Sequence, residues 1–174
     1  MKNTCRIGIV GKGFVGSAVA HGFSASCGYN AEIRIYDKDP SRRSHSLDET
    51  VNSSDFIFIS VPTPANSNGE NDLSILNRVL EDINSINKSS SNIILVRSTI
   101  IPGTTEELQK KFKNLRLVFN PEFLTERSAN FDFINQTRII LGGSKKNTDL
   151  VSRLYRDRFG EHLPVVQTDF QTAE

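Results

Sequence analysis

The chain has 174 residues, of which 37% are hydrophobic and 24% charged, a composition that suits one packed domain and argues against disorder. Its 21 lysines and arginines nearly balance its 20 acidic residues, so bulk charge favours neither nucleic acid nor an anionic membrane as a partner. We expect no secretory leader and no membrane span, because no apolar run approaches the roughly 20 residues required. Two cysteines, Cys5 and Cys27, are too few for a disulfide framework or a structural zinc site. We therefore predict a cytoplasmic protein with reduced thiols and no metal.

Short apolar runs recur along the chain and predict the strands of one sheet. In chain order they cover residues 6–10, 32–36, 55–61, 92–96, 115–119, 138–141 and, more briefly, 163–166. Helical periodicity lies between them, over residues 14–23, 73–86, 105–112 and 148–159. Strands that alternate with helices are typical of βαβ units. We predict an α/β fold: a Rossmann-like, doubly wound, mostly parallel sheet of about six to seven strands, with helices on both faces.

A glycine motif follows the first predicted strand and opens the first predicted helix. Gly11–Gly16 reads G-x-G-x-x-G, and Asp37 ends the second strand 21 residues after Gly16. In this context the glycines permit a tight turn and close approach of a pyrophosphate, and the acid accepts hydrogen bonds from a ribose. A carboxylate there would repel a 2′-phosphate, which favours NAD over NADP, although Arg42 and Arg43 follow closely. The alternative is an ordinary strand–helix turn beside a solvated acid. The candidate cofactor-binding residues are Gly11, Lys12, Gly13, Phe14, Val15, Gly16 and Asp37.

Polar residues also follow the third, fourth and fifth predicted strands, at the carboxyl edge where open α/β sheets bind ligands. Thr63 lies between two prolines that stiffen the turn after the third strand. Ser98 and Thr99 place hydroxyls at the tip of the fourth, where a ligand role and a plain loop are about equally supported. Thr104 or Thr105 is expected to cap the next helix.

Two acids, Glu122 and Glu126, follow the fifth strand beside Pro121. Their spacing of four residues would place them on one face of a helix, where carboxylates can serve as a general base or position a water molecule. The alternative is an ordinary helix N-terminus with acids in its first turn.

Taken together, these motifs resemble the N-terminal domain of the UDP-glucose/GDP-mannose dehydrogenases. The matching segments run in order over essentially the whole chain: GKGFVG at 11–16, Asp37, VPTP at 61–64, RSTIIPGTT at 97–105, NPEFLTE at 120–126, RIILGG at 138–143 and TDFQTAE at 168–174. The set from VPTP to NPEFL is far more specific than the glycine motif alone. The resemblance implies an NAD-dependent oxidoreductase that converts the primary alcohol of a nucleotide sugar, UDP-glucose or similar, to a carboxylate with two NAD.

The resemblance also implies roles for single residues. Thr99 would hold a catalytic water near cofactor and sugar, Glu122 would assist proton transfer during thioester hydrolysis, and Glu126 would lie close to the nicotinamide. Phe123 and Leu124 would line the sugar side together with Glu122. Thr63 and Arg42 would contact the cofactor.

Two features depart from the family pattern. The segment between Asp37 and Asp55 is short, so we expect a reduced sheet edge beyond the second strand, and Arg127 stands where the family often has glycine. We expect residues 1–174 to form a single NAD-binding domain that ends where the family's central helix starts, without the substrate domain that carries the catalytic cysteine. Cys5 and Cys27 are then structural thiols, and the isolated chain binds NAD but does not complete the oxidation. The alternative is a stand-alone NAD-binding or regulatory module. Family members form homodimers or larger assemblies.

Overall fold

A computed structural model describes residues 4–67 and 69–174 and contains one seven-stranded sheet in the order β2-β1-β3-β4-β5-β6-β7. The strands are β1 (Arg6–Val10), β2 (Glu32–Tyr36), β3 (Phe56–Ile59), β4 (Ile93–Val96), β5 (Leu117–Phe119), β6 (Ile139–Gly142) and β7 (Val165–Thr168). All seven predicted strands are thus confirmed, with boundaries shifted by a few residues. The predicted short edge is also present, since β2 ends the sheet.

The strands are parallel except at one junction. β5 and β6 pair antiparallel through Phe119 and Gly142, whereas β6 and β7 are again parallel. β1 lies between β2 and β3, so the chain moves in opposite directions from β1 to build the two sides of the sheet. In doubly wound sheets such a switch point creates a crevice at the carboxyl ends of the strands. The glycine motif follows β1 directly into this crevice.

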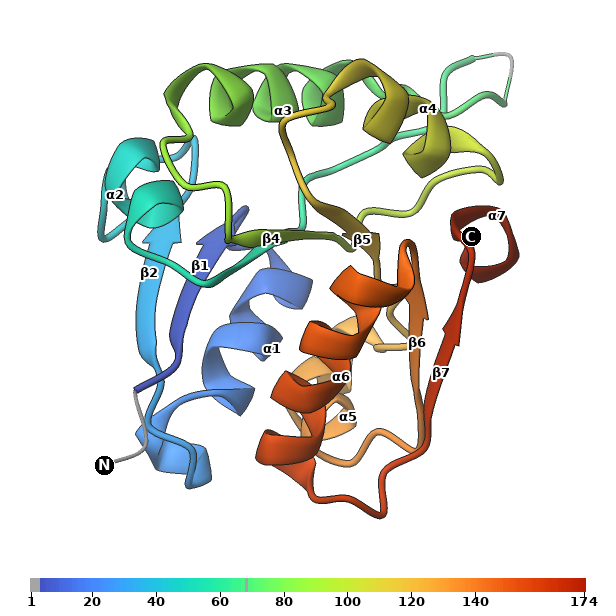
Figure 1. Cartoon of the computed structure of the whole chain (residues 1–174). Helices are drawn as coiled ribbons and strands as arrows, with labels where there is room; N and C mark the ends of the chain where they lie inside the picture. Colours follow the sequence, from blue (N-terminus) through green and yellow to red (C-terminus); the bar gives the residue numbers. More distant parts are fainter. Residues whose placement is uncertain (1–3, 68) are drawn as a thin grey trace.

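Helices cover both faces of the sheet (Figure 1). One face carries α1 (Phe14–Gly22), α5 (Ala129–Ile134) and α6 (Lys145–Phe159); the other carries α2 (Leu47–Asn52), α3 (Ser74–Ile86) and α4 (Thr104–Lys111). Short 3₁₀ segments span Ala25–Cys27 and Glu126–Ser128, and α7 (Phe170–Ala173) ends the chain. None of the helices in the described part of the chain is long and apolar enough to cross a bilayer.

Each face has its own buried apolar cluster. Phe23, Phe133 and Tyr155 are fully buried under α1, α5 and α6, and the Phe23 ring meets the other two at 5.8 and 6.2 Å between centroids. On the other face, α3 turns Leu76, Leu80 and Ile83 inward at helical spacing. The sheet is therefore buried on both sides, which explains why its central strands read as continuous apolar runs.

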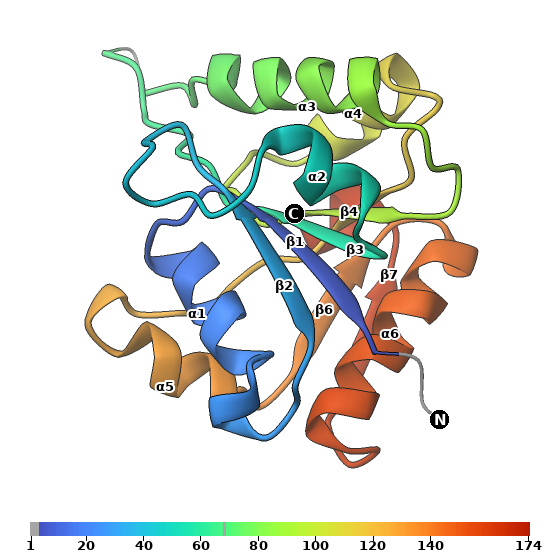
Figure 2. The same cartoon turned by 90° about the vertical axis from the view of Figure 1, so that its left-hand side faces the viewer.

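Two helices, α2 and α5, lie in segments for which the sequence analysis predicted none. Each has six residues, too short for the apolar repeat that reveals a helix. α2 nevertheless begins with a capping box, in which the Ser46 hydroxyl accepts from the Glu49 N–H and the Glu49 carboxylate accepts from the Ser46 N–H. A Ser-x-x-Glu pattern is typical of a helix start, so it could have predicted α2 from the sequence. Figure 2 shows α2 beside β2 and β1, over the sheet edge.

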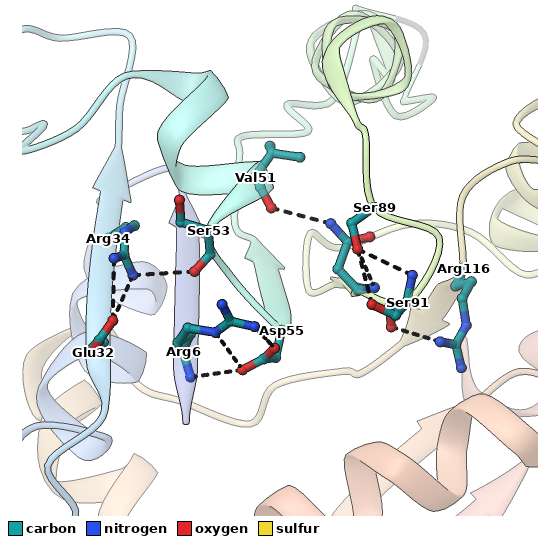
Figure 3. Close-up of polar contacts among 10 residues, drawn as sticks. Arg6, Glu32, Arg34, Val51, Ser53, Asp55, Ser89, Ser91 and Arg116 are labelled. Carbon is teal, nitrogen blue, oxygen red and sulfur yellow. Dashed lines mark hydrogen bonds and ion pairs between the residues drawn. The ribbon is translucent and has the colours of Figure 1, made fainter. Parts of the chain in front are cut away.

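Polar contacts tie together the amino-terminal edge of the sheet (Figure 3). Arg6 forms an ion pair with Asp55 at 2.5 Å, joining the start of β1 to the residue before β3. Arg34 on β2 donates to the Ser53 carbonyl oxygen, and Arg116 donates to the Ser91 carbonyl oxygen at 2.7 Å. These contacts are structural, and they leave the opposite edge of the sheet for ligands.

Candidate functional site

The glycine motif forms the tight turn between β1 and α1. Gly11 has φ +96°, a conformation that favours glycine, and a Cβ there would lie 2.5 Å from the Ser60 carbonyl oxygen. A Cβ on Gly16 would lie 2.0 Å from the Gly11 carbonyl oxygen, so the helix approaches the turn as closely as backbone permits. A Cβ on Gly13 would meet nothing within 4 Å. The three glycines thus differ: two are required by packing, and the middle one faces open space.

The N-terminus of α1 lies at that open space. Gly13 is the N-cap and has no side chain with which to cap the helix, and the first turn carries no acidic residue. The first N–H groups of a helix lack intrahelical acceptors, and the helix dipole adds partial positive charge there. An open glycine and an uncapped helix start together suit a phosphate group.

Asp37 is held against the glycine turn although it is 25 residues away from it in sequence. One carboxylate oxygen accepts the Lys12 N–H at 2.6 Å, and the other accepts the Asp39 N–H at 2.9 Å. These bonds fix the carboxylate and leave it further lone pairs for a ribose hydroxyl. Arg42 lies nearby but is exposed and pairs with Asp39 at 3.4 Å.

The tips of β3 and β4 are joined by side chains from both loops. The Thr63 hydroxyl donates to the Thr99 carbonyl oxygen at 2.6 Å, and Asn71 donates to the same oxygen at 3.1 Å. The Ser98 hydroxyl donates to the Val61 carbonyl oxygen at 2.7 Å. Thr63 and Thr99 are therefore neighbours, as their positions after adjacent strands predict. Asn71, which the sequence analysis did not select, completes this contact from the polar loop after β3.

The acids after β5 do not share a helical face, so that expectation is wrong. Residues 121–125 are not helical, and Glu126 only begins a 3₁₀ turn. The Glu122 carboxylate instead turns back to accept the Leu124 N–H at 2.5 Å, a local side-chain to backbone bond that competes with helix formation. Glu126 is exposed at the start of the next turn.

The helix after β4 is not capped by Thr104 or Thr105, contrary to expectation. Gly103 is the N-cap, in a left-handed conformation, and the Thr104 hydroxyl donates to the Ile101 carbonyl oxygen. The Glu174 carboxylate supplies the cap by accepting the Gly103 and Thr105 N–H groups. A cap supplied by a residue about 70 positions away cannot be predicted from the local sequence around the helix start.

A buried polar cluster at the tips of β4 and β5 was also missed. Arg97 is 4% exposed and its Nη1 donates to the Asn120 side-chain oxygen at 2.5 Å and to the Tyr155 hydroxyl at 3.1 Å. Tyr155 donates to the same Asn120 oxygen, and burial raises the pKa of its hydroxyl. The sequence does offer one indication of this cluster, because Arg97 directly follows an apolar strand. A buried arginine is rare without a partner, so a charged residue at that position predicts polar groups around it.

The two cysteines lie away from the strand tips. Cys5 immediately precedes β1, where burial above all, and then the Asp55 carboxylate, raise its thiol pKa to about 11. Cys27 ends the first 3₁₀ segment with its sulfur 3.3 Å from His21 Nε2. Within the described ranges no cluster of three or more metal-binding side chains occurs.

Comparison with known proteins places this site in a family. The profile of the UDP-glucose/GDP-mannose dehydrogenase family, NAD binding domain, matches residues 38–158 and so begins just after Asp37. UDP-glucose 6-dehydrogenase of Rickettsia bellii is 30% identical over 131 residues, which is 72% of this chain and 30% of that protein. GDP-mannose 6-dehydrogenase of Pseudomonas aeruginosa is 30% identical over 139 residues, 72% of this chain and 31% of that protein.

Solved structures agree with these sequence matches. The GDP-mannose dehydrogenase of Pseudomonas aeruginosa, solved as a ternary complex, superposes with a TM-score of 0.80 at 26% identity, over 97% of this chain and 47% of that one. A 3-hydroxyisobutyrate dehydrogenase of Mycobacterium tuberculosis shares the fold at 14% identity, with a TM-score of 0.70 over 98% of this chain and 56% of that one. The chain spans about a third of the two named sequence relatives. It belongs to the UDP-glucose/GDP-mannose dehydrogenase family, of which it contains the NAD-binding domain.

Proposed function

We propose that the chain binds NAD in the service of a nucleotide-sugar 6-dehydrogenase, which oxidises the primary alcohol of the sugar to a carboxylate. The observation that carries the proposal is the turn at Gly11–Gly16, where an open middle glycine meets an uncapped helix N-terminus. The residues present fit a dinucleotide: the N–H groups at the start of α1 bind the pyrophosphate, and Asp37 binds the adenosine ribose. The same carboxylate repels a 2′-phosphate, so NAD is preferred to NADP.

The strand tips supply the groups around the reacting carbon. NAD, when bound, provides the hydride acceptor. We assign Thr99 to positioning a water molecule and Glu122 to proton transfer, with Glu126 beside the nicotinamide and Thr63 and Arg42 on the cofactor. The contact of the Thr63 hydroxyl with the Thr99 carbonyl supports this by holding the β3 and β4 loops in one arrangement. Glu122, Phe123 and Leu124 form the side that faces the sugar.

The 174 residues are proposed to act as one cofactor-binding domain without complete catalysis. Neither cysteine lies at the strand tips, so a thiol nucleophile for a thioester step would have to come from another domain. We therefore expect NAD binding but no NADH production from UDP-glucose or GDP-mannose by this chain. The alternative, a stand-alone NAD-binding module, predicts the same result for the isolated chain. The gene distinguishes the two, since only the enzyme requires a coding sequence for a substrate domain with a cysteine. The compartment is proposed to be the cytoplasm.

Calorimetric titration of the purified chain with NAD and with NADP tests the proposal. We expect NAD to bind more tightly, and Asp37→Ala to cost about 1–3 kcal/mol of NAD binding, the range for groups left without hydrogen-bond partners. Equal or tighter binding of NADP would contradict the role of Asp37. Steady NADH production by the purified chain would contradict the proposed incompleteness.

A further inference from the structure

The Thr99 carbonyl oxygen, just beyond β4, accepts hydrogen bonds from two side chains of a neighbouring loop. The Thr63 hydroxyl donates to it at 2.6 Å and the Asn71 side-chain nitrogen at 3.1 Å. A carbonyl oxygen has two lone pairs, so both of its acceptor positions are in use. We call this arrangement, with Thr63 and Asn71 on the Thr99 carbonyl, the Thr99 clamp. Both donors come from the loop between β3 and α3, so the clamp joins the tips of two adjacent strands.

The Thr99 side chain is free although its backbone is held. Thr99 is exposed, and its hydroxyl forms no hydrogen bond with any residue in the described part of the chain. The residues on either side, Ser98 and Ile100, are only 5% and 6% exposed, so packing anchors the chain around it. Threonine is β-branched and has few χ1 rotamers, so a fixed backbone also restricts the direction of its hydroxyl. The clamp therefore presents a free hydroxyl from a fixed peptide.

Asn71 is placed by backbone contacts on both sides of it. It pairs with Ala65 in an antiparallel bridge, and the Asp72 N–H donates to the Pro64 carbonyl oxygen at 2.8 Å. The Asp72 carboxylate in turn accepts the Ser74 N–H at 2.8 Å, where α3 begins. A backbone that is already fixed leaves little conformational entropy to lose when its side chain makes a contact. The Asn71 amide is thus held in reach of the Thr99 carbonyl.

The Thr99 clamp and Asp37 lie on opposite sides of β1 in the sheet. Asp37 follows β2, which flanks β1 on one side, whereas the clamp follows β3 and β4 on the other. A dinucleotide binds across the switch point of a doubly wound sheet. When its adenosine ribose is on Asp37, the nicotinamide half of NAD therefore extends toward the loops that the clamp joins. This step rests on the proposed function.

We propose that Asn71 is a positioning residue for the nicotinamide half of NAD, and that it acts through the Thr99 carbonyl. Its amide holds the Thr99 peptide so that the free hydroxyl is directed toward the nicotinamide end before the cofactor arrives. Preorganisation of this kind raises affinity, because less conformational freedom is lost on binding. Asn71 has this role without touching the cofactor, since its donor is directed to the Thr99 carbonyl.

Calorimetric titration with NAD and with ADP-ribose, which lacks the nicotinamide, tests the proposal. Asn71→Ala removes the donor without adding charge, and should weaken NAD binding about three- to tenfold, the equivalent of one neutral hydrogen bond. Binding of ADP-ribose should be unchanged, because the glycine turn and Asp37 are intact. An equal loss for both ligands would assign Asn71 a general structural role, and unchanged NAD binding would remove it from the site. Either result overturns the proposal.

Matched variants separate positioning from loop stability. Asn66→Ala is the control, because Asn66 lies in the same loop and its side chain forms no hydrogen bond with the described residues. Its NAD affinity should equal that of the natural chain. Thr63→Ser keeps the second donor of the clamp and should bind NAD within about twofold of the natural chain, whereas Thr63→Val keeps the shape, loses the donor and should weaken binding about as much as Asn71→Ala.

Carbon-13 NMR follows the clamp itself, without cofactor. The Thr99 carbonyl resonance should shift in Asn71→Ala and stay in place in Asn66→Ala, because only the first variant removes a donor from that oxygen. An unchanged resonance in Asn71→Ala would contradict the clamp. If the natural chain binds neither NAD nor ADP-ribose, the proposed function fails and this inference with it. If the natural chain binds both and Asn71→Ala binds NAD equally well, this inference alone fails.

Discussion

The Glu174 carboxylate accepts the backbone N–H groups of Gly103 and Thr105 and so caps α4 from 71 and 69 residues further along the chain. Gly103 is the N-cap of α4 and offers no side chain of its own. The capped turn directly continues the β4 loop, whose Thr99 carbonyl is held by Thr63 and Asn71. The last residue of the sequence therefore helps to fix the loop that carries a proposed catalytic residue.

Replacing Glu174 should loosen that turn. Glu174→Ala removes a cap, a loss that costs about 0.5–2 kcal/mol of unfolding free energy in other helices. Amide hydrogen exchange at Gly103 and Thr105 should accelerate by a corresponding factor, measurable by NMR. Glu161→Ala is a suitable control, since that side chain is 85% exposed and its nearest cation lies 3.8 Å away. Unchanged exchange in Glu174→Ala would show that the cap does not stabilise the turn.

The glycine turn offers a matched pair of substitutions. Gly16→Ala would place a Cβ 2.0 Å from the Gly11 carbonyl oxygen, and should destabilise the fold by about 1–3 kcal/mol, as overpacking does. Gly13→Ala adds a Cβ that meets nothing within 4 Å in the free protein, so its stability should fall by at most about 1 kcal/mol, the cost of alanine in place of glycine at an N-cap. The new methyl would instead obstruct a pyrophosphate, and NAD should bind about tenfold or more weakly. Chemical denaturation and calorimetry measure the two effects; equal NAD affinity in Gly13→Ala would argue against a phosphate at this turn.

The two thiols should react at different rates. Burial raises the pKa of Cys5 to about 11, so only about 0.1% of it is thiolate at pH 8, whereas a free thiol near pKa 8.5 is about a quarter ionised. Both thiols are partly exposed, and Cys27 lies beside His21. Iodoacetamide should therefore label Cys27 at least about tenfold faster than Cys5, as followed by mass spectrometry of Cys5→Ser and Cys27→Ser. Faster labelling of Cys5 would mean that its surroundings are open in solution.

Asp132 should make the fold sensitive to acid. Hydrogen bonds from the Thr125 N–H and the Ser128 hydroxyl lower the pKa of this carboxyl below its ordinary value of 3.8. Because the folded-state pKa is depressed, the stabilisation is fully present above about pH 3.8 and is lost as pH falls through the folded-state pKa.

Urea unfolding of Asp132→Asn at several pH values measures this contribution. The variant should have a lower midpoint than the natural chain at pH 6, and the difference should shrink below about pH 3.8. Asp82→Asn, on the exposed side of α3, serves as the control, because the Asp82 carboxylate forms no hydrogen bond or ion pair with the described residues. A difference that persists unchanged at low pH would assign the effect to packing rather than charge.

Local patterns were sufficient for the larger elements of the fold. The apolar runs at β1 to β7 and the repeat in α3 appear in the sequence because a doubly covered sheet and an amphipathic helix both require regular burial. The six-residue helices α2 and α5 were not predicted, because a helix of about one and a half turns shows almost no apolar periodicity in its sequence. The antiparallel placement of β6 was also hidden, since a strand's own sequence does not record the direction of its neighbour.

The fold class, the glycine turn and the motifs that mark the family can be predicted from sequence, because each depends on residues close together in the chain. Which of those residues meet depends on how the chain folds. Folding placed Asp37 on the Lys12 N–H, Glu174 on the start of α4, and Arg97 against the Tyr155 hydroxyl. Those contacts join residues 25 to 71 positions apart, and the strand order and the packing of helices on the sheet bring them together. Short-range sequence patterns carry no information about partners at that separation.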